Sequence, residues 1–220
     1  MEKEIIFQHE GLQLFGHITK VFHSKAWVIF AHGSGSSRKS SRNNWVARKL
    51  NQNGFSTLLI DLLTKGEDEI FQNRFDIPLL SKRLLAATDW LIHSPYYEQT
   101  PIAYFGASTG AAAALEACAN APDSIQLFAI ISRGGRPDLA SEEALGEVLI
   151  PTLLIVGSRD DEVIRLNEYA KTFLFDAKLV LIPGATHLFE ETGALEEVVK
   201  LASNWLDSHL GHKELSETHP

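Results

Sequence analysis

The chain has 220 residues, of which 45% are hydrophobic and 22% are charged, the proportions of an ordinary globular protein. Its formal net charge is −8, from 20 basic and 28 acidic residues, so it lacks the basic excess that nucleic acid or an anionic membrane would require of a partner. We expect one α/β domain over residues 1–210 and a disordered tail over residues 211–220.

The elements expected along the chain alternate between strand and helix. An antiparallel hairpin comes first, with strands over 3–8 and 11–20 around Glu10 and Gly11. Six near-continuous apolar runs then suit strands covered on both faces: 26–33, 56–63, 101–108, 127–134, 151–158 and 177–184. Helical patterns lie between or after them, at roughly 41–53, 78–93, 109–120, 163–174 and 191–209. This order predicts a mostly parallel, doubly wound sheet with helices on both faces, whose ligand site lies at the carboxyl ends of the strands.

A candidate nucleophile lies at the end of the third of these apolar runs. The motif G-x-S-x-G spans Gly106 to Gly110, with a strand pattern before it and a helical pattern after it. Its glycines are typical of the sharp strand-to-helix turn that exposes a reactive serine, here Ser108. The alternative is that Ser108 only caps the helix.

A serine hydroxyl needs a base to remove its proton, and His187 is the predicted base. It lies in "LIPGATHLF", on a short loop between the last strand and the last helix. The acid is expected after the preceding strand, in "LLIVGSRDDEV", where Asp160 is favoured and Asp161 is the next choice. The acidic cluster could instead be a plain helix start. The chain order Ser, Asp, His is the one that α/β-hydrolases use.

The loop "HGSGSS", which follows the strand 26–33, is predicted to form half of an oxyanion hole. One donor would be the backbone N–H of Thr109, the residue after the nucleophile, and the second the N–H of Ser34. His32 is interpreted as a residue that orders this loop. The histidines lack the spacing of metal ligands, so neither a metal nor a cofactor is expected.

The chain resembles the dienelactone-hydrolase-like proteins of the α/β-hydrolase superfamily. The segments that carry the resemblance are "FAHGSGSSRKSSRN", "TLLIDLLT", "RFDIPLLSKRLLAATDWL", "YFGASTG", "SRGGRPDLA", "LLIVGSRDDEV" and "PGATHLFEE". They resemble most closely a subgroup of small bacterial hydrolases without a cap domain, some of them joined to a phosphoribosyltransferase-like domain. Dienelactone hydrolases proper use a cysteine nucleophile, where this sequence has Ser108. The resemblance therefore implies a serine hydrolase acting on esters more than dienelactone chemistry itself.

Two further stretches are candidates for substrate contacts. Arg133 and Arg136 follow a strand in "SRGGRPDLA" and could grip a substrate carboxylate, or could pair with Asp138 or Asp76 to hold the loop. The polar segment 64–76 could form a rim or small lid, although its apolar residues are interpreted first as anchors that pin a long loop.

The function expected is hydrolysis of a small or medium carboxylic ester, a small-molecule substrate, through an acyl-enzyme. The alternatives are a thioesterase or lactone hydrolase with the same residues, and a binding module that has kept the fold without turnover. No apolar stretch of membrane-spanning length or secretion signal is expected, and the single cysteine, Cys118, falls in an Ala-rich helical pattern that suggests buried filler. A cytoplasmic protein is predicted, and a homodimer formed through an edge strand stays open.

Overall fold

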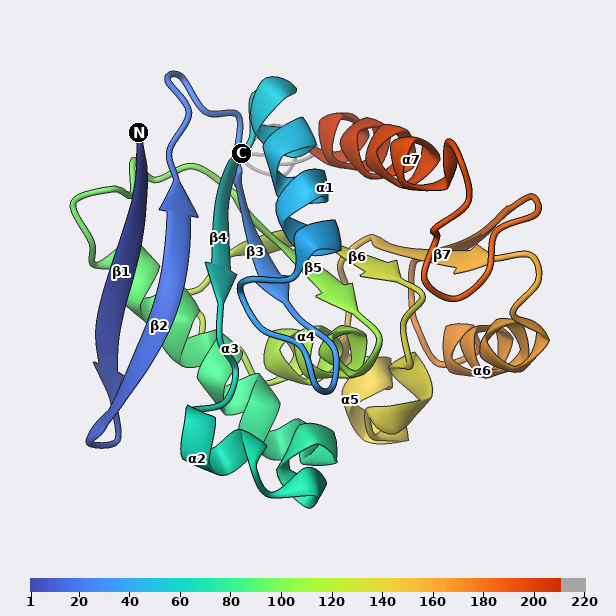
Figure 1. Cartoon of the computed structure of the whole chain (residues 1–220), viewed down its shortest axis with the longest axis horizontal. Coiled ribbons are helices and arrows are strands. Elements are labelled where there is room, and N and C mark those ends of the chain that lie inside the picture. Colours follow the sequence, from blue (N-terminus) through green and yellow to red (C-terminus); the bar gives the residue numbers. More distant parts are fainter. Residues whose placement is uncertain (211–220) are drawn as a thin grey trace, which may run out of the picture.

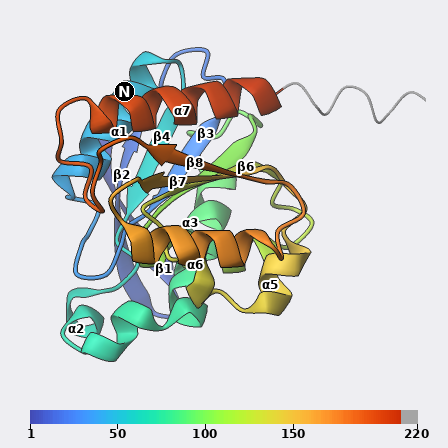
Figure 2. The same cartoon turned by 90° about the vertical axis from the view of Figure 1, so that its right-hand side faces the viewer.

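The computed structural model describes residues 1–210 and consists of one eight-stranded sheet between two layers of helices (Figures 1 and 2). The strands are β1 (Glu2–His9), β2 (Leu12–Thr19), β3 (Trp27–Ala31), β4 (Ser56–Ile60), β5 (Ile102–Ala107), β6 (Leu127–Arg133), β7 (Thr152–Gly157) and β8 (Ala177–Ile182). Their order in the sheet is β1-β2-β4-β3-β5-β6-β7-β8. The β1–β2 and β2–β4 pairs are antiparallel and the rest are parallel. The predicted α/β-hydrolase architecture, with its N-terminal hairpin, is confirmed.

Helices cover both faces of the sheet. The long helices are α1 (Ser41–Gln52), α3 (Ile77–Ile92), α4 (Thr109–Ala119), α6 (Asp161–Lys171) and α7 (Ala194–His209). Helices α1 and α7 pack on one face, and α3, α4 and α6 on the other (Figure 2). The residues of the parallel strands β3, β4, β5 and β7 are all buried, as expected for strands covered on both sides.

Several helices begin where a side chain satisfies the free N–H groups of the first turn. Ser40 caps α1, and Asp76 caps α3 by accepting a hydrogen bond from the N–H of Leu79 at 3.0 Å. Helix α6 begins at Asp161, two residues before the apolar periodicity predicts, since its first turn is acidic and exposed. The predicted tail, residues 211–220, lies outside the described residues.

The segment 64–76 differs from the long polar loop that was expected there. It forms the short helix α2 (Lys65–Asp68) and a 3₁₀-helix (Phe71–Phe75). The Thr64 hydroxyl accepts a hydrogen bond from the Glu67 N–H, and the Glu67 carboxylate accepts one from the Thr64 N–H. This reciprocal pair explains why a helix starts there. Ile70, Phe71 and Phe75 are exposed, so the interpretation of these residues as buried anchors was wrong. The smaller elements α5 (Glu142–Glu147) and a second 3₁₀-helix (Pro137–Leu139) were not predicted.

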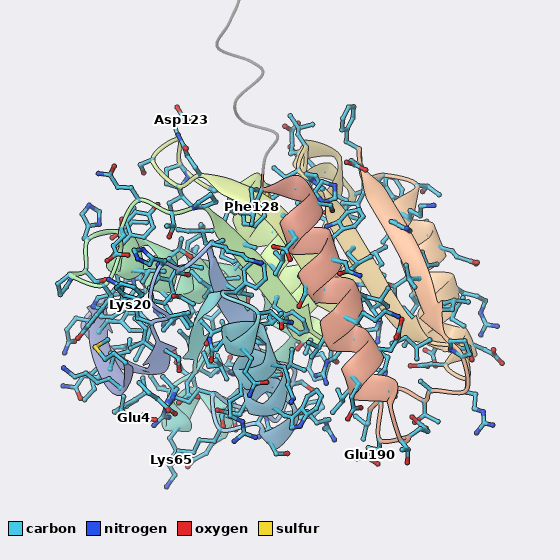
Figure 3. The ribbon with its side chains drawn as sticks, turned by 90° about the horizontal axis from the view of Figure 1, so that it is seen from above. Glu4, Lys20, Lys65, Asp123, Phe128 and Glu190 are labelled. Carbon is cyan, nitrogen blue, oxygen red and sulfur yellow. The ribbon has the colours of Figure 1, made fainter. Side chains whose placement is uncertain are left out.

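The carboxyl ends of the parallel strands lie at one edge of the sheet. Figure 3 shows Lys65 and Glu190, which follow β4 and β8, at one edge of the molecule, Asp123 at the opposite edge, and Phe128 further inside on the same side as Asp123. The segments that follow β3, β5, β6, β7 and β8 therefore approach one another. These are the segments that contain the candidate site residues.

Candidate active site

Ser108 forms a strained turn between β5 and α4. Its φ of 52° and ψ of −124° are rare for a residue other than glycine. The flanking glycines make the turn possible: a β-carbon at Gly106 would lie 2.4 Å from Ala111 Cα, and one at Gly110 would lie 2.2 Å from Ala31 O. The hydroxyl caps no N–H of α4, so the alternative of a simple capping serine does not describe this turn.

His187 and Asp160 form a hydrogen-bonded pair. The loop after β8 carries His187, whose Nδ1 lies 2.7 Å from Oδ2 of Asp160, the residue before α6. Asp160 does not cap α6, so its carboxylate is directed to the imidazole. A proton on Nδ1 shared with the carboxylate leaves Nε2 as the proton acceptor of the ring. Asp161 is instead the first residue of α6.

The turn of Ser108 and the loop of His187 both pack on the segment that follows β6. The Ser108 N–H donates to Arg133 O at 3.4 Å, and Ser108 O accepts from the Arg136 N–H at 3.0 Å. A β-carbon at Gly134 would lie 3.1 Å from His187 O and 3.7 Å from its Cε1. Within residues 1–210, Ser108 Oγ makes no hydrogen bond to His187 or to any other group. Such contacts are often long in enzymes without substrate and shorten when substrate binds.

The loop after β3 lies against the turn of Ser108. A β-carbon at Gly33 would be 2.9 Å from Ser108 Cβ, which explains why this loop lacks side-chain bulk. The next N–H, that of Ser34, meets no acceptor in the described chain, and Thr109 starts α4, where an N–H has no intrahelical acceptor. The described structure thus leaves two N–H groups without an acceptor, that of Ser34 directly after Gly33 and that of Thr109 directly after Ser108.

His32 fixes this loop to the end of β4. Its Nε2 accepts a hydrogen bond from the Leu62 N–H at 3.0 Å, so Nδ1 carries the ring proton and donates to Gly33 O at 2.9 Å. Burial lowers the pKa of His32 and so favours the neutral ring that this arrangement needs. These contacts agree with a residue that orders the loop.

The two arginines of "SRGGRPDLA" have different environments. Arg136 donates Nε and Nη2 to the two carboxylate oxygens of Asp138, each at 2.8 Å, which is the loop-holding alternative. Arg133 is 8% exposed and donates Nη2 to Asn43 Oδ1 at 3.1 Å. Its Nε and Nη1 are buried without a partner, and burial together with the nearby Arg42 lowers the pKa of Arg133 to about 10. The described structure shields both free nitrogens of Arg133 from solvent.

Other candidate features lie away from Ser108. A groove of about 590 Å³ opens toward the opposite edge of the sheet, lined among others by Phe128 and Pro151 (Figure 3). Cys118 lies in α4, and burial raises the pKa of its thiol to about 12.

Within residues 1–210 there is no group of three or more His, Cys, Asp or Glu side chains placed to hold a metal ion. No helix in the same range is long and apolar enough to cross a membrane.

Sequence reasoning did not identify the neighbours of these residues. Asn43, buried in α1, contacts Arg133 from 90 positions away. Leu62, just after β4, binds His32 through its backbone. Neither residue has a local signal, because asparagine in a polar helix and leucine at a strand end are both common.

Comparison with known proteins finds hydrolases that are similar to this chain. A family model described as "Serine aminopeptidase, S33" matches residues 23–139. A solved dienelactone hydrolase from Anabaena variabilis ATCC 29413 is 49% identical, with a TM-score of 0.89 over 95% of this chain and 98% of that one. Est1E from Butyrivibrio proteoclasticus, solved with ferulic acid bound, shares the fold at 18% identity, with a TM-score of 0.80 over 94% and 99% of the two chains.

A relative with a different name matches as well. A Mycobacterium tuberculosis protein that carries the provisional name phosphoribosyl transferase is 52% identical over 196 residues, which is 89% of this chain and 44% of that protein. The chain thus spans less than half the length of that relative.

Proposed function

We propose that this chain, which belongs to the α/β-hydrolase superfamily, is a serine hydrolase that cleaves carboxylic esters through an acyl-enzyme. One observation carries the proposal: the strained Ser108 turn and the His187–Asp160 pair, held at 2.7 Å, pack on the same segment after β6. A plain structural role would not require a strained serine beside two open backbone donors.

In the proposed mechanism, Ser108 Oγ attacks the ester carbonyl carbon while His187 Nε2 takes the hydroxyl proton. Asp160 holds the ring in the required tautomer and stabilises the imidazolium. The N–H groups of Ser34 and Thr109 donate to the oxygen on which negative charge develops. When the tetrahedral intermediate collapses, the C–O bond to the alcohol breaks and His187 gives its proton to the leaving oxygen. A water molecule, activated in the same way, then hydrolyses the acyl-enzyme and restores Ser108.

The proposed substrate needs no charge. Two of the donor nitrogens of Arg136 are already paired with Asp138, and the free nitrogens of Arg133 are shielded from solvent. A substrate carboxylate would reach Arg136 only through its remaining Nη1, and Arg133 only after its cover moved. We therefore propose that Arg133 and Arg136 contact a substrate only when the ester carries a negative charge.

Labelling by a fluorophosphonate probe tests the nucleophile. We expect one adduct per chain on Ser108, detected by intact mass and peptide mapping, and no adduct in Ser108→Ala. Ser94→Ala serves as the matched control, because it removes a serine hydroxyl that donates to Leu91 O at 2.7 Å near the end of α3 and belongs to no part of the proposed site. Labelling of Ser108→Ala at full stoichiometry would overturn the assignment, and a folded wild type without labelling or esterase activity would favour the binding module.

A second candidate reaction is lactone hydrolysis, which the 49% identity to a dienelactone hydrolase favours. The same residues could open a lactone, because a lactone is a cyclic ester. Comparing kcat/KM for simple lactones, thioesters and p-nitrophenyl esters distinguishes these substrates. The provisional transferase name belongs to a relative of which this chain spans less than half, so we propose hydrolysis and not phosphoribosyl transfer.

A further inference from the structure

A buried asparagine links α6 to the segment that follows β6. Asn167 lies in the middle of α6 and is 0% exposed. Its side-chain amide donates to Gly135 O at 2.9 Å and to Val163 O, four residues back in the same helix, at 2.8 Å. Among the described residues, no other group donates to Gly135 O. The Asn167 amide therefore joins the first turn of α6 to a loop that lies 32 positions away in the chain.

An asparagine is a costly residue at this position. Its short polar side chain disfavours the interior of a helix, and the Oδ1 of Asn167 is buried without a partner in the described chain. An apolar residue of similar shape would avoid both costs. What the amide provides, and an apolar residue cannot, is the hydrogen bond to the loop after β6.

Gly135 lies between two residues that contact the proposed site. On one side, the Arg136 N–H donates to Ser108 O at 3.0 Å. On the other side, Gly134 packs against the loop after β8, since a β-carbon there would lie 3.1 Å from His187 O. Gly135 itself is buried between them. A shift of the Gly135 peptide would therefore displace both the turn of the nucleophile and the loop of the imidazole.

The second hydrogen bond of the amide reaches the start of α6, next to the proposed acid. Val163, which accepts this bond through its carbonyl, belongs to the first turn of the helix. Asp160 comes directly before that turn, and its carbonyl accepts from the Ile164 N–H at 2.9 Å. The carboxylate of Asp160 holds His187 Nδ1 at 2.7 Å. Asn167 thus connects the helix turn that follows the acid with the loop that supports the nucleophile.

We propose that Asn167 is a positioning residue, whose amide sets the distance between the His187–Asp160 pair and the Ser108 turn. The inference rests on the proposed function and adds a residue that is too deeply buried to touch a substrate. Without the amide, the buried Gly135 carbonyl would lack a donor, so its loop would have to move to find one. Because a misplacement of about 1 Å can cost roughly 100-fold in rate, a small movement is enough to lower kcat.

Asn167→Leu tests the inference, because leucine has a similar shape and cannot donate a hydrogen bond. The substrate is p-nitrophenyl acetate, and kcat is counted per site that a fluorophosphonate titrates to completion. We expect this kcat to fall about 10- to 100-fold while KM stays within about threefold of the wild type. A merely destabilised protein would contain fewer titratable sites, but each folded molecule would keep its kcat.

Thr88→Val in α3 is the matched control. Thr88 is as buried as Asn167, its hydroxyl donates to Leu84 O at 2.8 Å, and it lies 2.8 Å from the Tyr104 hydroxyl. Valine has the same shape and removes both bonds, but none of these partners belongs to the proposed site. We expect Thr88→Val to unfold at a lower temperature and to keep the kcat of the wild type per titrated site.

Each outcome decides the inference or the function. An unchanged kcat per titrated site in folded Asn167→Leu would overturn the inference and leave the proposed function standing, as would an equal loss of kcat in Thr88→Val. If Asn167→Leu does not fold, Asn167→Ala, whose smaller side chain cannot clash, must show the same fall in kcat at constant KM. Failure of both variants to fold would assign Asn167 to stability alone and overturn the inference. A folded wild type that neither labels on Ser108 nor hydrolyses the ester would overturn the proposed function itself.

Discussion

Replacing Gly33 with alanine would test whether the loop after β3 positions an oxyanion donor. The new β-carbon would lie 2.9 Å from Ser108 Cβ and 3.1 Å from Ala107 O. Gly33 does not have a positive φ, so alanine meets no backbone strain there and the perturbation is steric. The substitution therefore pushes the loop and the nucleophile turn apart without removing any functional group.

The expected loss follows from these distances. Carbon atoms in contact prefer about 3.5–4.0 Å, so the two segments must separate by about 0.6–1.1 Å. A misplacement of about 1 Å can cost roughly 100-fold in rate, and loss of one oxyanion donor costs about 10²–10³ in kcat. We expect kcat to fall about 100- to 1000-fold with little change in KM, because the donor acts mainly in the transition state.

Steady-state kinetics with p-nitrophenyl acetate would measure this effect. Gly146→Ala in α5 is the matched control, since a β-carbon there meets nothing within 4 Å. Circular dichroism and thermal unfolding should show both variants folded. If folded Gly33→Ala keeps kcat within about threefold of the wild type, the loop does not position the donor and the reasoning is refuted.

Three other predictions concern Asp160, His32 and Cys118. Asp160→Asn should lower kcat by roughly 10⁴-fold while the protein stays folded, because the amide no longer favours the required His187 tautomer; a loss under tenfold in steady-state assays would contradict its role. Burial lowers the pKa of His32 in the folded state, so below about pH 6.5 the unfolded chain binds a proton at this imidazole that the folded protein does not bind. The free energy of unfolding therefore falls as the pH is lowered, by at most about 1.4 kcal/mol per pH unit from this group. In urea unfolding, His32→Gln should lose less stability than the wild type between pH 7 and pH 5, and parallel losses would show that His32 does not carry the effect. Cys118 is half-buried and burial raises the pKa of its thiol to about 12, so it should react with a disulfide reagent at pH 8 much more slowly in the native protein than in the unfolded chain; equal rates would contradict the raised pKa.

Local patterns in the sequence were sufficient for the architecture and for the region of the site. Apolar runs without alternation predict buried parallel strands, and in a parallel sheet their carboxyl ends must share an edge. That rule alone brings the segments bearing Ser108, Asp160 and His187 to one region. The glycines around Ser108 and the bare loop at Gly33 were also readable, because close backbone approach leaves no room for a β-carbon.

Only the tertiary structure decided what each side chain at that edge contacts. The direction in which α6 starts determines that Asp160, and not Asp161, reaches His187. The neighbours of Arg133 and Arg136 determine that the first is enclosed and the second is paired with Asp138. Such contacts join residues far apart in the chain and depend on distances of a few tenths of an ångström, which no local pattern of residue types encodes.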